Sequence, residues 1–260
     1  QIISIINQKG GVGKTTTVIN LAAGLSQLNK KILVIDLDPQ GNATTGLGLS
    51  NTGNSETTIY SVLNGNKKIF DVIQKTKFEN LSLITSNVDL SGLEVETAGD
   101  SRRAFKLKDE ITLLINNSRA SYDYILIDCP PSLGLLTVNA LCAAYSVLVP
   151  LQCEFYALEG LSQLMRTIAL VQGRLNRQLA MQGIVLTMYD GRNKLSEQVA
   201  NDVRTHLGNL VYNSVIPRNV RISEAPSFGQ PVLIYDLSCA GSKAYIALAA
   251  ELLEQEKEAA

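Results

Sequence analysis

Short runs of aliphatic and β-branched residues alternate with longer amphipathic stretches along this chain. The apolar runs lie at residues 2–6, 32–36, 81–85, 124–128, 146–150, 183–188 and 211–216. Several of them are apolar at successive positions, which is typical of parallel strands covered by helices on both faces. The pattern therefore predicts an α/β fold with a doubly wound, mostly parallel sheet.

The stretches between the expected strands have helical spacing. Apolar residues recur on one face of the first expected helix, which ends at Asn29: they are Val18, Leu21, Ala22, Leu25 and Leu28. Further helices are expected at residues 104–117, 135–144, 158–174, 195–207 and 242–255. Residues 41–66, rich in Gly, Asn, Ser and Thr, are expected to form a loop with one short helix. With no internal repeat or long linker, residues 1–260 are expected to form a single domain.

The composition is that of an ordinary globular protein, with 45% hydrophobic residues, 18% charged residues and a formal net charge of −1. This balance argues against wholesale disorder. The chain also has no overall positive charge to attract nucleic acid or anionic lipid, so binding to either would need a local patch of positive charge. The uncharged stretch 129–153 is interrupted by proline, glycine and asparagine, so we do not expect it to span a membrane. Because the chain opens on a strand-like run, no signal peptide and a cytoplasmic location are expected.

The cysteines are too far apart along the chain for the usual zinc or iron–sulfur spacing. Their surroundings are small or apolar, which favours reduced, buried thiols. The four are Cys129, Cys142, Cys153 and Cys239.

A glycine-rich stretch, K-G-G-V-G-K-T-T, joins the first expected strand to the first expected helix. Glycines let backbone N–H groups surround phosphate oxygens, and the helix N-terminus adds partial positive charge. Lys14 is expected to reach the β and γ phosphates of ATP, and the Thr15 hydroxyl to ligate Mg²⁺. The expected nucleotide-binding residues of this loop are Lys9, Gly10, Gly11, Val12, Gly13, Lys14, Thr15 and Thr16.

The start of the loop departs from the common phosphate-loop pattern. That pattern has a glycine six residues before the lysine, where this chain has Gln8 followed by a second lysine, Lys9. The arrangement resembles the deviant Walker A motif, whose early lysine reaches across a dimer to the partner's nucleotide. By this resemblance Lys9 joins Lys14 as an expected catalytic residue; a solvated loop lysine is the alternative.

Two of the expected strands end in aspartate. Residues 32–36 lead into Asp36 and Asp38, and residues 124–128 end in Asp128. Doubly wound sheets bind ligands at the carboxyl ends of their strands, so these carboxylates are expected near the loop. Asp128 and Asp36 are expected Mg²⁺ ligands beside Thr15, directly or through water. Asp36 could equally be a turn or cap residue. Asp38 is the expected catalytic residue that orients the attacking water.

Five blocks of the chain resemble, in the same order, the ParA/Soj family of partition ATPases. They are residues 7–17 (NQKGGVGKTTT), 36–44 (DLDPQGNAT), 127–132 (IDCPPS), 152–160 (QCEFYALEG) and 216–226 (IPRNVRISEAP). The resemblance extends over nearly the whole chain.

The resemblance implies an ATP- and Mg²⁺-dependent cycle. Two ATP-bound copies would pair face to face as a homodimer, bind double-stranded DNA without sequence preference and be released when a ParB-type partner stimulates hydrolysis. This implies a bacterial, nucleoid-associated protein that segregates chromosomes or plasmids. It also implies that Pro217 and Arg218 lie near the adenine, and that Arg192 and Arg221 contact DNA.

The charge distribution supplies a separate reason to expect a DNA-facing side. Residues 160–225 contain eight lysines and arginines against four acidic residues, although the whole chain has a net charge of −1. Such a patch binds phosphates only if its residues share one face; ordinary solvated surface charge is the alternative.

Two other classes use a similar ATP-dependent switch. A membrane-associated relative resembling MinD would need a basic amphipathic C-terminal helix, whereas residues 249–260 are acidic. A redox enzyme resembling the nitrogenase iron protein would need cluster-bridging cysteines, and Cys129 and Cys153 lack the expected glycine-rich surroundings.

Overall fold

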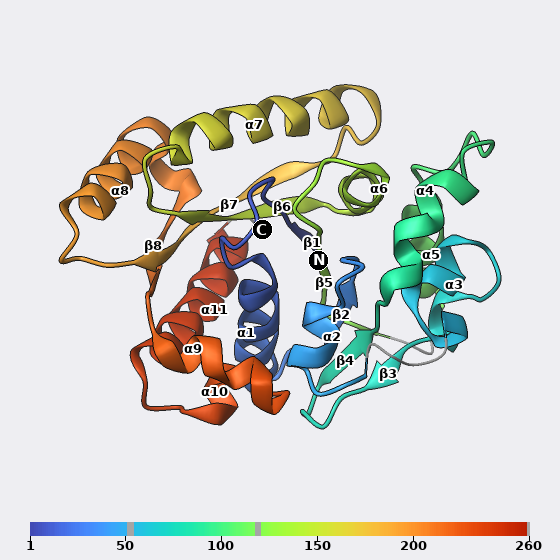
Figure 1. The fold of residues 1–260 in the computed structure, drawn as a ribbon, viewed down its shortest axis with the longest axis horizontal. Coiled ribbons are helices and arrows are strands. Elements are labelled where there is room, and N and C mark those ends of the chain that lie inside the picture. Colours follow the sequence, from blue (N-terminus) through green and yellow to red (C-terminus); the bar gives the residue numbers. More distant parts are fainter. Residues whose placement is uncertain (51–54, 118–120, 259–260) are drawn as a thin grey trace.

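The computed structural model describes residues 1–50, 55–117 and 121–258. At its centre is an eight-stranded sheet with the strand order β3-β4-β2-β5-β1-β6-β7-β8 (Figure 1). Neighbouring strands pair in parallel except β3, which runs antiparallel to β4. From the central strand β1 the sheet extends through β6, β7 and β8 on one side and through β5, β2, β4 and β3 on the other. This arrangement confirms the expected doubly wound, mostly parallel α/β fold.

The expected strands are all present, with shifts of a few residues at their ends. The strands are β1 (Ile2–Ile5), β2 (Ile32–Asp36), β3 (Gln74–Lys75), β4 (Leu81–Ile84), β5 (Tyr124–Asp128), β6 (Ser146–Gln152), β7 (Ala180–Tyr189) and β8 (Val211–Pro217). The sequence pattern does not predict β3, because a two-residue edge strand is too short to show any periodicity.

The long expected helices are also present. They are α1 (Lys14–Gln27), α5 (Lys106–Asn116), α6 (Leu135–Ala143), α7 (Ala157–Arg174), α8 (Lys194–Leu207) and α11 (Ala240–Glu258). Three short helices had not been expected: α4 (Leu93–Glu96), α9 (Val220–Glu224) and α10 (Val232–Tyr235). Helices of four or five residues are too brief for an apolar face to repeat, so sequence spacing does not reveal them.

The expectation of one short helix in residues 41–66 was wrong. The described part of this segment contains α2 (Asn42–Gly46), α3 (Ile59–Leu63) and a 3₁₀ turn at Ser55–Thr57; residues 51–54 lie outside the description. Tertiary contacts hold both helices: Ala43 is buried against one face of the sheet and Ile59 against the other. Short helices of this kind depend on packing rather than on their own propensity.

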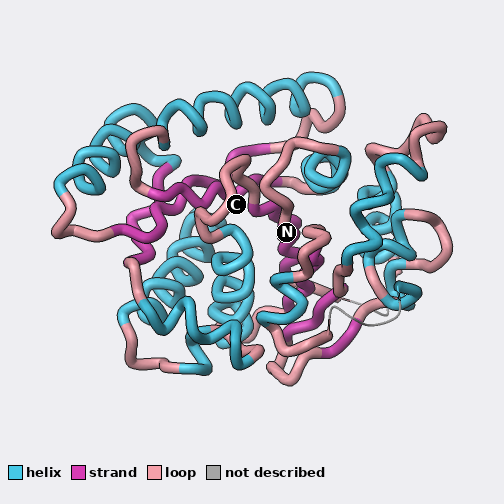
Figure 2. Tube along the Cα trace, viewed as in Figure 1, coloured by secondary structure: helices cyan, strands magenta, loops and turns pink. Residues whose placement is uncertain are grey.

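Helices cover both faces of the sheet (Figure 2). On one face α1, α10 and α11 pack with strand residues such as Ile32 and Val34. On the other face α3, α5, α6, α7 and α8 pack with the alternate residues, such as Leu33 and Ile35. Both faces of β2 are therefore buried, which accounts for the continuous apolar run at residues 32–35.

The two long helices on the first face approach each other closely at a glycine. A Cβ atom on Gly24 of α1 would lie 3.0 Å from the Cβ of Ala249 in α11. Small residues at this crossing allow α1 to lie close to α11, and α1 begins directly after the glycine-rich loop.

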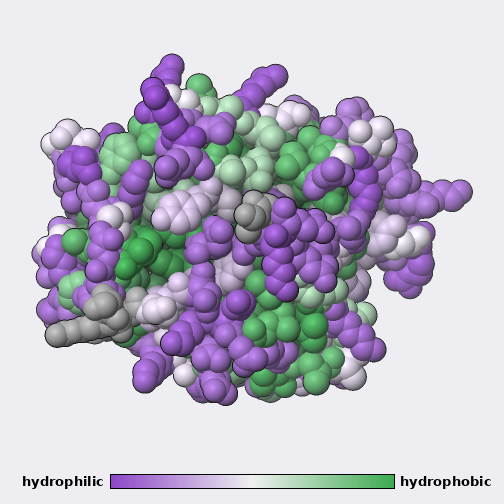
Figure 3. All heavy atoms as spheres, turned by 180° about the vertical axis from the view of Figure 1, so that it is seen from behind, coloured by the Kyte–Doolittle hydropathy of each residue, from purple (hydrophilic) through white to green (hydrophobic). Residues whose placement is uncertain are grey.

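Seen from behind, the surface is mostly hydrophilic, with hydrophobic residues gathered in separate areas (Figure 3).

Candidate functional site

The glycine-rich loop follows β1, and Asn7, two residues before the loop begins, anchors the chain to the sheet. Asn7 donates a side-chain hydrogen bond to the Pro150 carbonyl at 2.8 Å and accepts one from the Lys9 N–H at 3.0 Å. Gly11 and Gly13 have φ angles of +75° and +88°. Side chains rarely adopt this left-handed region, so both positions favour glycine.

The loop ends on the first turn of α1, which has no acidic residue and no side-chain cap. The N–H groups at the start of a helix have no intrahelical partner, and with the helix dipole they attract anions. From β7, Thr187 donates its hydroxyl to the Val12 carbonyl at 2.8 Å and so holds the loop against the sheet. The main chain is thereby shaped to surround an anion before the helix begins.

The two lysines of the loop have different surroundings. Lys14 is only 7% exposed, and its amine donates to the Lys9 carbonyl at 3.0 Å. Burial lowers the pKa of Lys14, while the carboxylates of Asp128 and Asp38 raise it. By contrast, the Lys9 side chain is 53% exposed and forms an ion pair with Glu154, just beyond β6. One amine thus lies inside the loop and the other on its rim.

Asp128 lies at the carboxyl end of β5, beside the central strand β1. It is fully buried, and neither of its carboxylate oxygens has a hydrogen-bond partner. Burial raises the pKa of Asp128 well above its ordinary value, with a further contribution from Asp36. The nearby Thr15 opposes this rise in the pKa of Asp128. Buried carboxylates normally have partners, so these oxygens fit a hard cation or its bound water.

Asp36 pairs in register with Asp128 on the neighbouring strand, but its oxygens are engaged. Thr44 donates both its N–H and its hydroxyl to Oδ2, each at 2.7 Å, and the Asp38 N–H donates to Oδ1 at 3.2 Å. Burial raises the pKa of Asp36 to about 6, although these hydrogen bonds oppose the shift. The contacts fit the cap and turn role that the sequence left open for Asp36.

Asp38 follows β2 and is 7% exposed. Its Oδ1 accepts the Gln40 N–H at 3.0 Å, which orients the carboxylate. Asp38 lies at the same edge of the sheet as the loop, because both follow the carboxyl ends of parallel strands, and its charge raises the pKa of Lys14. No group of three or more His, Cys, Asp or Glu side chains in the described ranges is placed to hold a metal.

A cavity of about 350 Å³ opens beside the end of the loop. Its lining includes Gly13 and Thr16, and the expected adenine residues Pro217 and Arg218 also line it. Several other lining residues are not expected from the sequence, among them Thr187, Met188, Asn219, Ile222, Ser223 and Pro226. Four of these six residues lie in the 216–226 block, so that block was the sequence signal that could have identified them as lining residues. Thr187 and Met188 come from β7, which carries no motif.

The two expected DNA-contacting arginines lie outside this site, on the surface. The Arg192 side chain is 92% exposed and pairs with Asp190 at 2.9 Å. The Arg221 side chain is 52% exposed and pairs with Glu224 at 2.9 Å and Asp236 at 3.5 Å. Both guanidinium groups are accessible, and each already has a carboxylate partner.

Comparison with known proteins gives consistent results. Residues 1–181 match the family model described as an AAA domain. The chain is 56% identical over 258 residues to the chromosome partitioning protein ParA of Caulobacter vibrioides, covering 99% of this chain and 96% of the relative. It is 49% identical over 252 residues to the sporulation initiation inhibitor protein Soj of Bacillus subtilis, covering 97% and 98%.

A solved structure is similar along the whole chain. Cobyrinic acid a,c-diamide synthase from Mycobacterium smegmatis, with a bound ATP analog and magnesium, superposes with a TM-score of 0.85 at 35% identity, covering 100% of this chain and 97% of that one. Within the described residues, no helix is long and apolar enough to cross a membrane. The full-length identity to proteins named ParA and Soj shows that this chain belongs to the ParA/Soj family of chromosome-partitioning ATPases.

Proposed function

We propose that residues 1–260 act as one ParA-type domain that forms an ATP-dependent sandwich dimer, binds DNA without sequence preference and is released by hydrolysis. The observation that carries this proposal is the contrast between the two loop lysines. Lys14 is buried and would neutralise the phosphates of its own subunit, whereas Lys9 is on the rim and exposed. A cation in that position can reach phosphates bound by a second copy facing it.

ATP and Mg²⁺ are the ligands that the site fits. A similar solved structure holds an ATP analog with magnesium, and the unpartnered Asp128 carboxylate suits a hydrated cation. We assign Mg²⁺ to the Thr15 hydroxyl and Asp128, with Asp36 keeping the surrounding turn in place. When bound, the cation would neutralise charge on the phosphate oxygens. Pro217 and Arg218 line the cavity that would receive the adenine.

We assign to Asp38 the role of orienting the water that attacks the terminal phosphate. Its carboxylate is nearly buried, close enough to Lys14 to influence that amine, and oriented by the Gln40 N–H. An anionic acceptor in this place can orient a water for attack on the terminal phosphate, while Lys14 neutralises the charge that develops there.

DNA binding is assigned to the basic region that includes Arg192 and Arg221. Both are exposed, and a dimer would present two copies of each. Arginine suits phosphate oxygens because its planar donors fit them well. A ParB-type protein is the proposed partner that triggers hydrolysis, with the nucleoid of a bacterial cytoplasm as the place of action.

A MinD-like membrane role fits the chain less well. The last described turns of α11 carry Glu251, Glu254, Glu256 and Glu258 against Lys257. Anionic lipid repels such a segment, whereas membrane-binding amphipathic helices are basic.

Sizing the Asp38→Ala variant tests the proposal most directly. We expect a monomer without ATP and a stable dimer with ATP and Mg²⁺, because hydrolysis should fall by about 100-fold or more while nucleotide binding remains. Duplex DNA should then co-elute with the dimer alone. Asp71→Ala, at an exposed turn, is the matched control and should cycle normally. Hydrolysis at the wild-type rate by Asp38→Ala would contradict the role assigned to Asp38. A variant that stays monomeric in the presence of ATP would contradict the proposed dimer.

A further inference from the structure

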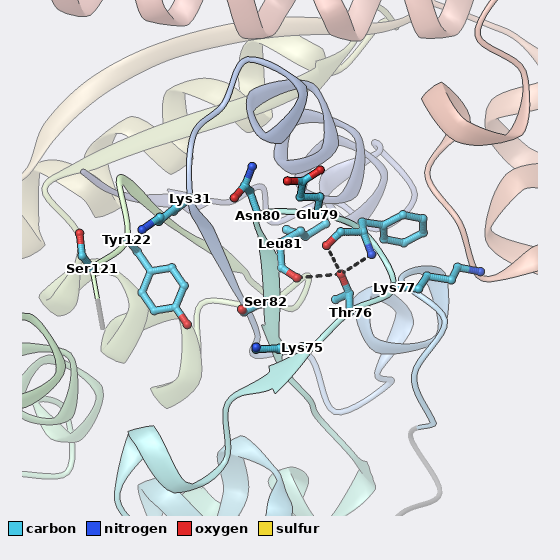
Figure 4. A pocket seen from close by; sticks show the side chains of 11 residues that line it. Lys31, Lys75, Thr76, Lys77, Glu79, Asn80, Leu81, Ser82, Ser121 and Tyr122 are labelled. Atoms are coloured by element: carbon cyan, nitrogen blue, oxygen red, sulfur yellow. Dashed lines mark hydrogen bonds between the residues drawn. The ribbon is translucent and has the colours of Figure 1, made fainter. Parts of the chain in front are cut away.

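A second concave site lies at the opposite edge of the sheet from the phosphate loop. It is a cavity of about 720 Å³ formed by the β3–β4 turn together with residues that precede β2 and β5 (Figure 4). Its lining includes Lys31, Lys75, Lys77, Ser82 and Tyr122. None of the residues assigned to ATP or Mg²⁺ lines it.

The strand register explains this position. Ile32 of β2 pairs with Leu81 of β4 and with Tyr124 of β5, so the amino ends of these three strands are level. Asp36 and Asp128 lie four residues further along, which corresponds to about 13 Å at ~3.3 Å per residue. The cavity is therefore separate from the ATP site, and a dimer formed through the loop edge would leave it accessible.

Positive charge gathers in this cavity without carboxylate partners. Lys75 and Ser82 are directly paired in the β3–β4 ladder, so their side chains lie on the same face of the sheet. In Figure 4 the Lys75 amine and the Tyr122 ring reach into the hollow, whereas Lys77 points away. No ion pair within the described ranges involves any of the three lining lysines.

The acidic groups nearby do not neutralise this charge. Glu79 is the acidic residue among those that line the cavity, and Figure 4 places its carboxylate well apart from Lys75. The carboxylate of Asp123 accepts the backbone N–H of Lys31 at 2.7 Å and does not line the cavity. With Lys77 directed away, the lining has two lysines, Lys31 and Lys75, against the one carboxylate of Glu79.

We propose that this lysine pocket, defined by Lys31, Lys75, Ser82 and Tyr122, binds a phosphate group. Ammonium groups bind phosphate as compact point charges, and the two hydroxyls add donors. A phosphate monoester carries a charge of about −1.5 to −2 at neutral pH. The two positive charges of Lys31 and Lys75 balance this charge more closely than they would balance the single negative charge of a carboxylate ligand. The volume lies within the roughly 300–1,000 Å³ typical of ligand pockets, so it also has room for a body attached to the phosphate.

The phosphate could belong to a free small molecule or to the DNA backbone, and the test separates these sources. The pocket variant is Lys31→Gln with Lys75→Gln. The matched control is Lys108→Gln with Lys243→Gln, which removes the same charge from α5 and α11 outside the cavity. Pyrophosphate is titrated calorimetrically into protein already saturated with ADP, so that the phosphate loop is filled. Gel retardation of duplex DNA is measured in parallel.

We expect pyrophosphate to bind the wild type and the control equally, and the pocket variant at least tenfold more weakly. A loss of DNA retardation in the pocket variant alone would also support the site and would identify the DNA backbone as the source of the bound phosphate. Unchanged pyrophosphate binding together with unchanged retardation would overturn the proposal. ATP hydrolysis without DNA should be the same in all three proteins, which keeps this result separate from the assigned ATP site. The single variant Lys75→Gln repeats the test should the double variant fold poorly.

Discussion

Thr44 donates both its backbone N–H and its hydroxyl to one oxygen of Asp36, each at 2.7 Å. The same hydroxyl accepts the Ser86 N–H at 3.0 Å. One buried threonine therefore joins the end of β2 to the first turn of α2 and to the segment after β4. Asp38, the assigned water-orienting residue, is two residues from this junction.

Thr44→Val is expected to lower the free energy of unfolding by roughly 1–3 kcal/mol, because Asp36 loses a hydrogen bond and the Ser86 N–H loses its acceptor in a buried place. It should also raise the pKa of Asp36 further, since the Thr44 hydrogen bond opposes the shift caused by burial. Urea unfolding measures the stability change. Thr45→Val is the control, because the exposed Thr45 hydroxyl bonds only to carbonyls of its own turn at 3.3 Å. Equal stability of the two variants would contradict the assigned role.

Lys9→Ala, combined with Asp38→Ala to prevent hydrolysis, is expected to bind ATP and remain a monomer. The buried Lys14 still neutralises the phosphates of its own subunit, but the cation on the rim is lost. Light scattering after size exclusion measures the mass. Glu154→Gln in the same background removes the Lys9 ion pair while keeping the amine, so it should still dimerise. An ATP-dependent dimer of the Lys9 variant would contradict the cross-subunit contact.

Arg221→Glu is expected to form the ATP-dependent dimer but to retain duplex DNA at least tenfold more weakly at moderate salt. Reversing a charge that contacts phosphates removes attraction and adds repulsion at both copies in the dimer. Gel retardation over a salt series measures the effect. Arg102→Glu is the control, because Arg102 is also exposed and paired with an acid, Asp109, on another part of the molecule. Equal losses in the two variants would point to net charge rather than to a specific surface.

Native protein is expected to react with iodoacetamide at pH 8 mainly at Cys239, and at all four cysteines in urea. Burial raises the pKa of Cys142 and Cys153 to about 11, so on the order of a thousandth of each thiol is ionised at this pH. Cys129 is fully buried and its pKa is raised well above its ordinary value. Cys239 is partly exposed. Mass spectrometry of the digested protein locates the adducts, and rapid native labelling of Cys129 would contradict the buried position.

Elements with a local pattern could be predicted from the sequence. The expected strand at residues 124–128 is β5 without change, because its burial on both faces makes it a continuous apolar run up to the terminal Asp128. The loop could be located because its glycines and lysines lie within six successive residues, 9–14. By contrast, β3 and the short helices have too few residues to repeat any pattern, and their positions come from packing.

The amino-acid sequence alone determined the order of strands and helices, the phosphate loop and the aspartates at the ends of two strands, because each depends on residues that are neighbours in the chain. Only the tertiary structure placed the Thr187 hydroxyl on the carbonyl of Val12, 175 residues earlier, and paired Lys9 with Glu154. It alone also assembled the lysine pocket from three segments. Such contacts depend on the register of parallel strands, in which residues far apart in sequence become neighbours once the sheet has formed.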